Sequence, residues 1–315
     1  MSLREQALGT QPDWLAMTEE ELIAYRDAEN QRRASPAMRA ITGTPHPDAD
    51  IQWQEIALPG RNLPVRVLRP ARTAPGTALP LVLHVHGGGF VGTAVQCDWI
   101  TSHVAVDLPA VVVSVEHRLL APDTPLRAAA DDGWDALEHV VRKAAEWGVD
   151  PARVAVFGES CGGLIGALTT LQAREAGLPL RAQVLVNPVT EVTDTMLAHA
   201  SIAEHADSPT LTVPQLQLIQ RLGVPPGTDA RTLSPLYADD LGGLPPALVL
   251  VPTQDPLADH ARRYAERLDA AGTPVRLAEF PGATHGFLSM PEVVPDAGRA
   301  RAEITAFLHD ALGQD

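Results

Sequence analysis

The strongest chemical signal in this sequence is a serine placed between glycines. The segment GESCGG, residues 158–163, directly follows an apolar stretch at 153–158 and directly precedes a helical pattern. A sharp turn from strand to helix exposes a serine hydroxyl in a strained conformation, and glycines two residues before and after it relieve the crowding. The amides at the start of the helix also point to where negative charge would form. In this context the pattern predicts that Ser160 is a nucleophile.

Three successive glycines provide the second signal, in the segment HGGG at residues 86–89. Such a loop is costly in conformational entropy, so we expect its backbone to approach a ligand or to direct amides toward one. We assign Gly88 and Gly89 to an oxyanion hole, with the backbone amide of Cys161 as the third donor. His86 precedes the serine along the chain, and we expect it to brace the loop.

A serine nucleophile needs a base, and the chain order serine, acid, histidine selects the late members among the 11 histidines. His285 lies in FPGATHGF, a loop with small residues around the ring, whereas His260 falls inside a predicted helix. Asp255 follows the carboxyl end of a predicted strand. Asp259 competes with it, but lies a turn into the next helix, where compensation of the helix dipole explains it. We therefore predict Ser160 as nucleophile, His285 as base and Asp255 as the acid that orients the histidine.

These side chains need a scaffold that brings them together, and the sequence alternates between strand and helix patterns. Nearly continuous aliphatic runs predict parallel strands covered on both faces, at residues 79–86, 110–116, 153–158, 182–187, 246–252 and 275–280. Helical patterns occur at residues 125–147, 160–176, 257–271 and 296–312. Alternating polarity at 51–57 and 63–69 predicts an antiparallel edge hairpin. The expected fold class is α/β, with a mostly parallel eight-stranded sheet and helices on both faces.

Two segments stand outside this alternation. Thr18 and Glu21 form a capping-box pattern that opens a helix through about Arg33. Residues 188–235 have no strand pattern, and an insertion of that length between strands is more often functional than not. A helical pattern near 214–222 falls within it. We expect an N-terminal helical cap segment over residues 1–50 and a catalytic domain over 51–315 that carries a cap insertion at 188–235.

The composition of the chain argues against several kinds of binding partner and site, beginning with nucleic acid. The chain has 24 Lys and Arg against 39 Asp and Glu, a net charge of -15, which is unsuited to binding nucleic acid. Neither a signal-peptide pattern nor an apolar run long enough to span a bilayer occurs, so we expect a cytoplasmic protein with no membrane span. Cys97 and Cys161 are too few for a disulfide framework and lack zinc-site spacing, so we expect free thiols and no metal site.

Taken together, these motifs resemble the hormone-sensitive-lipase-like family of α/β-hydrolases, and in particular its bacterial carboxylesterases. The resemblance covers HGGGF at 86–90, RLLAP at 118–122, GESCGG at 158–163, SPL at 234–236, DPLAD at 255–259 and HGF at 285–287. It implies an α/β-hydrolase fold with a cap built from the N-terminus and an insertion after the sixth strand. It also implies no cofactor and the hydrolysis of short- to medium-chain carboxylic esters, small-molecule substrates. Family members often pair through an edge strand and final helix, which would allow a homodimer through residues 275–312.

Three positions depart from the family pattern. Glu159 replaces the usual aspartate, Cys161 the usual alanine, and His117 the usual tyrosine before the RLLAP segment. The oxyanion amide survives the second change because it belongs to the backbone. We expect the thiol of Cys161 to point away from a bound acyl group and not to act as the nucleophile, although its oxidation or alkylation would crowd the oxyanion site.

Two other functions are compatible with the same motifs. One is hydrolysis of a different acyl substrate, an amide or a lactone, because a serine–histidine–acid triad does not by itself choose the leaving group. The other is a non-catalytic protein of the same fold that binds a small ligand. The presence of serine, acid and histidine together favours an enzyme.

Overall fold

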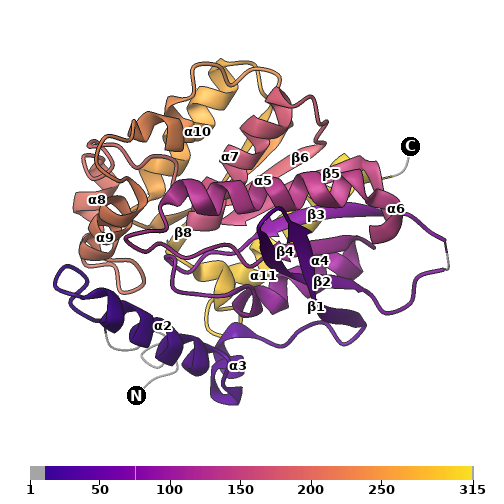
Figure 1. The fold of residues 1–315 in the computed structure, drawn as a ribbon, viewed down its shortest axis with the longest axis horizontal. Coiled ribbons are helices and arrows are strands. Elements are labelled where there is room, and N and C mark those ends of the chain that lie inside the picture. The colour runs from indigo at the N-terminus through magenta and orange to yellow at the C-terminus, as the bar shows by residue number, and fades with distance from the viewer. Residues whose placement is uncertain (1–10, 75, 314–315) are drawn as a thin grey trace.

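An eight-stranded sheet forms the centre of the computed structural model, which describes residues 11–74 and 76–313. The strand order is β1-β2-β4-β3-β5-β6-β7-β8 (Figure 1). The strands are β1 (Ala49–Leu58), β2 (Arg61–Pro70), β3 (Leu79–Val85), β4 (Val111–Val115), β5 (Val149–Glu159), β6 (Ala182–Val186), β7 (Ala247–Gln254) and β8 (Val275–Thr284). β1 and β2 form an antiparallel hairpin at one edge, and β3 to β8 run parallel. The predicted α/β class, edge hairpin and eight strands are confirmed.

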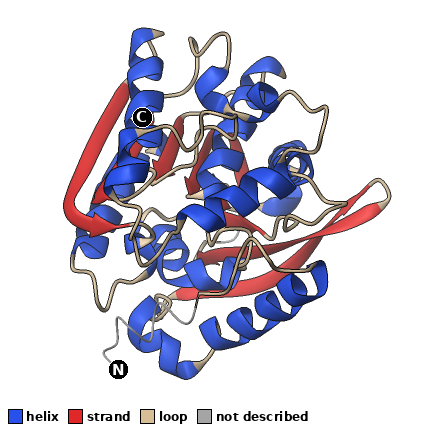
Figure 2. Cartoon of the chain, turned by 90° about the vertical axis from the view of Figure 1, so that its left-hand side faces the viewer, coloured by secondary structure: helices blue, strands red, loops and turns tan. Residues whose placement is uncertain are grey.

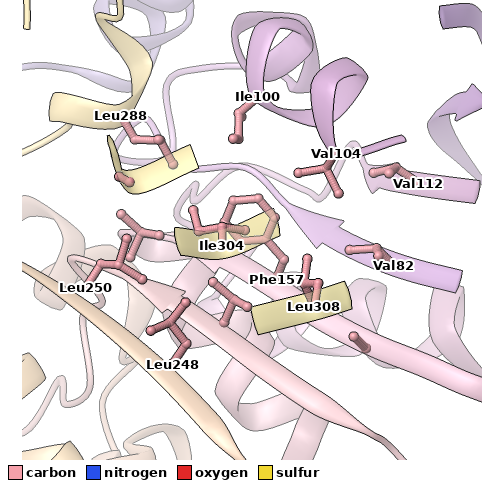
Figure 3. Close-up of a cluster of buried hydrophobic side chains, with 14 of the residues drawn as sticks. Val82, Ile100, Val104, Val112, Phe157, Leu248, Leu250, Leu288, Ile304 and Leu308 are labelled. Carbon is pink, nitrogen blue, oxygen red and sulfur yellow. The ribbon is translucent and has the colours of Figure 1, made fainter. Parts of the chain in front are cut away.

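The inner strands β3, β4 and β6 are buried along their whole length, as their aliphatic runs predicted. Because successive side chains of a strand point to opposite faces, each strand contributes to two layers of core. Val82, Val112 and Phe157 pack on one face with Ile304 (Figure 3). The alternate residues of the same strands, such as Leu83, join a cluster on the other face. The sheet thus becomes a rigid support for the loops at its ends.

Helices cover both faces of the sheet, and Figure 2 shows the strands as a layer between helices. One face carries α4 (Asp98–Asp107) and α11 (Asp296–Leu312). The other face carries α5 (Leu126–Arg142), α7 (Cys161–Glu175) and α10 (Ala258–Ala270). This arrangement explains why the strands lack polar alternation, since neither face meets water.

Three local features differ from the sequence prediction. The helix α4 was not predicted, because polar residues such as Thr101 and Ser102 lie on its buried surface and blur the helical period. The expected helix at 125–147 ends at Arg142, and a separate turn, α6 (Ala144–Trp147), follows Lys143. β8 continues beyond residue 280, because its pairing with β7 resumes after a register shift and joins Gln254 to Thr284.

The N-terminal segment packs against the sheet-bearing part of the chain. Thr18 and Glu21 form the predicted capping box of α2 (Glu19–Arg33), and α3 (Pro36–Thr42) follows. Leu22 of α2 joins a buried cluster with Leu218 of α9 (Val213–Gly223), and both helices lie on one side of the molecule in Figure 1. Of the expected segment 1–50, residues 1–10 lie outside the described part. The described part contains the helices α2 and α3, the second of which ends at Thr42, and β1 begins at Ala49.

The segment after β6 has helices in place of strands, as its sequence suggested. It contains α8 (Ala200–Glu204), α9 (Val213–Gly223) and the 3-10 turns η2 (Ala230–Leu233) and η3 (Pro235–Tyr237). Further 3-10 turns elsewhere are η1 (Ala94–Cys97) and η4 (Phe287–Ser289). Within residues 11–74 and 76–313, no helix has both the length and the apolar character needed to cross a bilayer.

Candidate active site

Ser160 occupies the turn between β5 and α7, where the backbone is strained. Its φ is 56° and its ψ is -118°, a conformation that non-glycine residues rarely adopt. The turn is so tight that a Cβ at Gly158 would lie 2.2 Å from the carbonyl oxygen of Gly162. A Cβ at Gly162 would lie 2.1 Å from the carbonyl oxygen of Val85 on the neighbouring strand. The glycines of GESCGG are therefore required by backbone packing.

Three side chains from distant parts of the chain form a hydrogen-bonded row. The Oγ of Ser160 lies 2.8 Å from Nε2 of His285, and Nδ1 of His285 lies 2.8 Å from Oδ2 of Asp255. The other carboxylate oxygen of Asp255 accepts the N–H of Leu257 at 2.8 Å, which holds the carboxylate in place. Ser160 and His285 are each 6% exposed and Asp255 is fully buried. The row is thus almost entirely shielded from solvent, but Ser160 at its end lines a cavity.

The parallel sheet explains why these three side chains lie close together. Ser160 follows β5, Asp255 follows β7 and His285 follows β8, so each side chain comes just after the carboxyl end of a parallel strand. These ends share one edge of the sheet, the usual place for ligand sites in such folds. The sequence prediction brought together the same three residues.

The imidazole of His285 is electrostatically tuned by its neighbours. Burial acts to lower its pKa, but attraction to the carboxylate of Asp255, the hydrogen bond between them and the charge of Glu159 outweigh burial, so the pKa is raised from its ordinary value of 6.5. A raised pKa makes the ring a stronger base. The arrangement is therefore suited to withdraw a proton from the hydroxyl of Ser160.

The glycine loop lies beside the serine and lines the same cavity. Gly88 and Gly89 have φ values of 101° and 64°, which favour glycine. Among the described residues, no backbone carbonyl accepts the N–H of Gly88 or Gly89, and the N–H of Gly89 reaches the thiol of Cys161. His86 is buried, with Nδ1 2.8 Å from the carbonyl oxygen of Gly87, and it stacks on His117 at 4.2 Å between ring centroids. The ring of His86 thus packs behind the loop, as expected of a brace.

The two cysteines are free and buried. Cys161 is 1% exposed, belongs to an apolar cluster with Phe90 and Leu164, and does not line the cavity. Burial raises the pKa of its thiol to about 11, with backbone N–H groups of the glycine loop acting in the opposite direction. Burial also raises the pKa of the Cys97 thiol well above its usual range. A buried, protonated thiol is a poor nucleophile, so the hydroxyl of Ser160 is the reactive group that the geometry favours.

A cavity opens in front of Ser160, with an empty volume of about 1120 Å³ that includes space open to solvent. Its walls come from α2, α3, the segment after β6 and the loops that carry the three aligned residues. Much of the wall is apolar, formed by Trp14, Met38, Ile41, Val91, Val189, Leu211, Leu216, Ile219, Leu257 and Met290. Polar side chains gather next to the glycine loop, where Nη1 of Arg33 donates to Oε1 of Gln96 at 2.7 Å. The cavity can therefore take an apolar chain and keep the reacting centre close to polar groups.

The residues that competed with the triad in sequence have other partners. Asp259 accepts the N–H of Ser201 at 2.9 Å and pairs with Arg262 at 3.2 Å. It thus ties α10 to α8. His260 is buried, and its Nε2 donates to the carbonyl oxygen of Met196 at 2.9 Å. Neither residue belongs to the row of three.

One buried cluster has the residue types of a metal site. Donor atoms of Glu191, His199 and His260 all lie within 4.8 Å of one another. They already have protein partners, since Nε2 of His199 lies 2.5 Å from Glu191 and its Nδ1 lies 3.3 Å from Arg263. The cluster joins the segment after β6 to α10, and hydrogen bonding within it accounts for its composition.

The sequence analysis missed the polar groups that surround the triad. Glu159 is 3% exposed and lines the cavity, and its carboxylate accepts a hydrogen bond from Oγ of Ser289 at 3.1 Å. Its departure from the family's aspartate was a signal, but its partner on η4 could not be read from the chain. Arg33 and Gln96 reach the glycine loop from α2 and η1, and nothing in their spacing indicated this.

Comparison with known proteins agrees with this geometry. Residues 82–289 match the family model of the α/β hydrolase fold. The chain is 36% identical to the carboxylesterase NlhH of Mycobacterium tuberculosis over 92% of each chain. It is 33% identical to the ethyl acetate hydrolase of Pseudomonas putida over 80% of each chain.

Solved structures show the same architecture. An ester hydrolase from the metagenome of Lake Arreo superimposes with a TM-score of 0.84, at 31% identity over 97% of this chain and 94% of that one. A thermostable esterase of Pseudomonas putida superimposes with a TM-score of 0.85, at 26% identity over 99% of this chain and 96% of that one. The motifs, the fold and these relatives agree, and the chain belongs to the hormone-sensitive-lipase-like family of α/β-hydrolases.

Proposed function

We propose that this chain is a serine carboxylesterase that hydrolyses short- to medium-chain carboxylic esters through an acyl-enzyme on Ser160. The observation that carries the proposal is the row from Ser160 through His285 to Asp255, with 2.8 Å at each step, whose serine and histidine line a cavity with both apolar and polar walls. The esterase names of its relatives support the same class of substrate. No cofactor is needed for this reaction.

The first half of the proposed reaction forms the acyl-enzyme. Nε2 of His285 takes the proton of the Ser160 hydroxyl as the oxygen attacks the ester carbonyl. The carboxylate of Asp255 holds the Nδ1–H tautomer and stabilises the imidazolium. The carbonyl oxygen becomes an oxyanion, for which we propose the amides of Gly88, Gly89 and Cys161 as donors. The imidazolium then protonates the leaving alcohol, and the acyl group stays on Ser160.

The second half releases the acid. A water molecule takes the place of the alcohol, and His285 removes its proton as it attacks the acyl carbonyl. The same oxyanion site would stabilise the second tetrahedral intermediate, so its donors act twice per turnover. Removing one such donor typically costs an enzyme about 2.7–4 kcal/mol of transition-state stabilisation.

We propose that the cap comprises residues 1–50 and 188–235 over a catalytic domain that otherwise spans 51–315. Residues of both cap segments line the cavity, among them Met38 and Ile41 from the first and Leu216 and Ile219 from the second. Apolar walls of this kind stabilise a hydrocarbon chain by roughly 0.8 kcal/mol per buried methylene. The preference for short chains is supported by the name of one relative, an ethyl acetate hydrolase.

A homodimer through β8 and α11 is part of the same proposal. β8 is the edge strand of the sheet and carries Leu277, which is 44% exposed. An edge strand has unpaired backbone groups, and an exposed apolar side chain on it favours pairing with a second copy. Light scattering after size-exclusion chromatography should give twice the monomer mass for the wild type, and a mass closer to that of the monomer for Leu277→Lys. A monomeric wild type would refute the proposed homodimer.

The decisive test is an esterase profile. Wild-type protein and Ser160→Ala should be assayed with p-nitrophenyl esters of increasing acyl length. We expect turnover that peaks at short or medium chains in the wild type and disappears in the variant. Turnover of amides or lactones in place of esters would redirect the proposal to another acyl substrate. Inactivity of the wild type toward all three, together with tight binding of a small ligand, would refute catalysis.

A further inference from the structure

A second carboxylate lies beside the triad, and no step of the proposed reaction uses it. Glu159 ends β5, immediately before Ser160, and is 3% exposed. Its only side-chain hydrogen bonds among the described residues come from Oγ of Ser289, at 3.1 Å to one carboxylate oxygen and 3.4 Å to the other. A buried carboxylate with one hydroxyl as partner is poorly compensated. Such a costly group calls for an explanation.

We propose that Glu159 is a positioning residue that acts through His285. Its carboxylate provides a second negative charge for the imidazolium, and its hydrogen bond with Ser289 holds the loop that carries His285 against β5. Ser289 ends η4, which begins two residues after His285. The glutamate is thus connected to the base both through space and through a short segment of backbone.

The electrostatic side of the proposal follows from which groups face one another. The groups acting on His285 are Asp255 and Glu159, and both favour its charged form. Those acting on Glu159 are His285 and Ser289, which stabilise the carboxylate, whereas burial opposes it and leaves its pKa raised. Burial, and to a lesser extent the charge of Glu159, raises the pKa of the Cys97 and Cys161 thiols, which are therefore neutral neighbours.

The charge of Glu159 stabilises His285 most when the imidazole is protonated. When His285 is neutral, Glu159 gains little from it. When His285 takes the proton of Ser160, a positive charge appears next to the buried carboxylate, where attraction is only weakly screened. Glu159 therefore stabilises the transition state more than the ground state, which is the condition for a faster chemical step.

The test compares pH profiles of kcat/KM for the wild type and Glu159→Gln. The amide keeps the shape and removes the charge. We expect the acid limb, which reports protonation of His285, to move to lower pH by about one unit. We expect kcat at pH 8 to fall by about tenfold, with KM less affected. Glu292→Gln is the matched control, since Glu292 is exposed and lies three residues after Ser289. It should leave the limb and kcat unchanged.

A second pair of variants separates charge from anchoring. Ser289→Ala keeps the carboxylate, so we expect an acid limb nearer to that of the wild type than in Glu159→Gln, with a smaller loss of kcat. Should the amide variant melt below the assay temperature, Glu159→Met takes its place. An apolar chain of similar volume often replaces a buried charge without loss of stability. The same shift of the limb is expected.

An unmoved acid limb in folded Glu159→Gln or Glu159→Met would overturn the proposal. The proposal rests on the proposed esterase function, but the two fail differently. If the wild type does not hydrolyse esters, the function fails. If the wild type hydrolyses esters and Ser160→Ala does not, while the neutral variants keep the wild-type limb, only the role of Glu159 fails.

Discussion

The turn that holds Ser160 allows a direct test, because two physical arguments predict opposite effects of one added methyl group on the stability of the protein. Gly162 is the second residue of α7, where alanine is a better helix former than glycine by about 0.8–1.0 kcal/mol. Helix propensity alone therefore predicts that Gly162→Ala stabilises the protein. Packing predicts the reverse, since the new Cβ would lie 2.1 Å from the carbonyl oxygen of Val85 and 2.5 Å from that of His86.

The size of the effect follows from the overlap. A carbon atom approaches a carbonyl oxygen comfortably at about 3.3 Å, so β3 and α7 would have to separate by about 1 Å. β3 cannot yield easily, because it pairs with β4 and β5 on its two sides. Overpacking of this kind typically costs about 1–3 kcal/mol. A displacement of about 1 Å at a catalytic centre can cost about 100-fold in rate.

The assay combines p-nitrophenyl ester hydrolysis with thermal unfolding followed by circular dichroism. We expect Gly162→Ala to lose about 100-fold in kcat and to melt at a lower temperature than the wild type. Gly298→Ala is the control, because Gly298 lies in the first turn of α11 and a Cβ there would meet nothing within 4 Å. It should keep full activity and the wild-type melting temperature or a slightly higher one. A Gly162→Ala protein with unchanged kcat and a raised melting temperature would refute the packing argument.

Five further outcomes are expected. Asp255→Asn should lower kcat by about 10⁴-fold, as loss of the orienting acid does in a serine protease, whereas Asp259→Asn should stay within a few-fold of the wild type; equal losses would mean that the acid is misassigned. Activity should fall as pH decreases through the raised pKa of His285, because the charged ring cannot accept a proton; a flat profile between pH 8 and about 5 would contradict this. Because the pKa of His285 is higher in the folded than in the unfolded state, its protonation stabilises the fold below pH 6.5. This stabilisation should be lost as pH rises through the folded-state pKa, and chemical denaturation at several pH values measures the free energy of unfolding that shows it. Cys161→Ala should keep most activity, and thiol reagents should leave the native enzyme active; rapid inactivation of the wild type but not of the variant would show that the thiol is accessible. Ile304→Ala, in the core of Figure 3, should lower the free energy of unfolding by about 2–5 kcal/mol, measured in urea.

Local patterns in the sequence were enough to predict the scaffold. Strands buried on both faces must be aliphatic throughout, and so β3, β4 and β6 were recognisable as parallel strands. The helix α4 was missed because its buried surface includes Thr101 and Ser102, which mask the helical period. The end of α5 was also misjudged, since the residues around Lys143 are good helix formers and only the chain's turn toward β5 ends the helix there.

The sequence by itself determined the candidate residues of the proposed reacting centre and the order in which they occur, because a serine in a strained turn and a loop of glycines need particular residue types at fixed short spacings. Only the tertiary structure decided which groups surround them. Glu159 meets Ser289 across 130 residues and Arg33 meets Gln96 across 63, and no local rule relates such positions. Contacts of this kind depend on how the helices settle on the sheet, where a shift of a few ångströms changes which side chains meet.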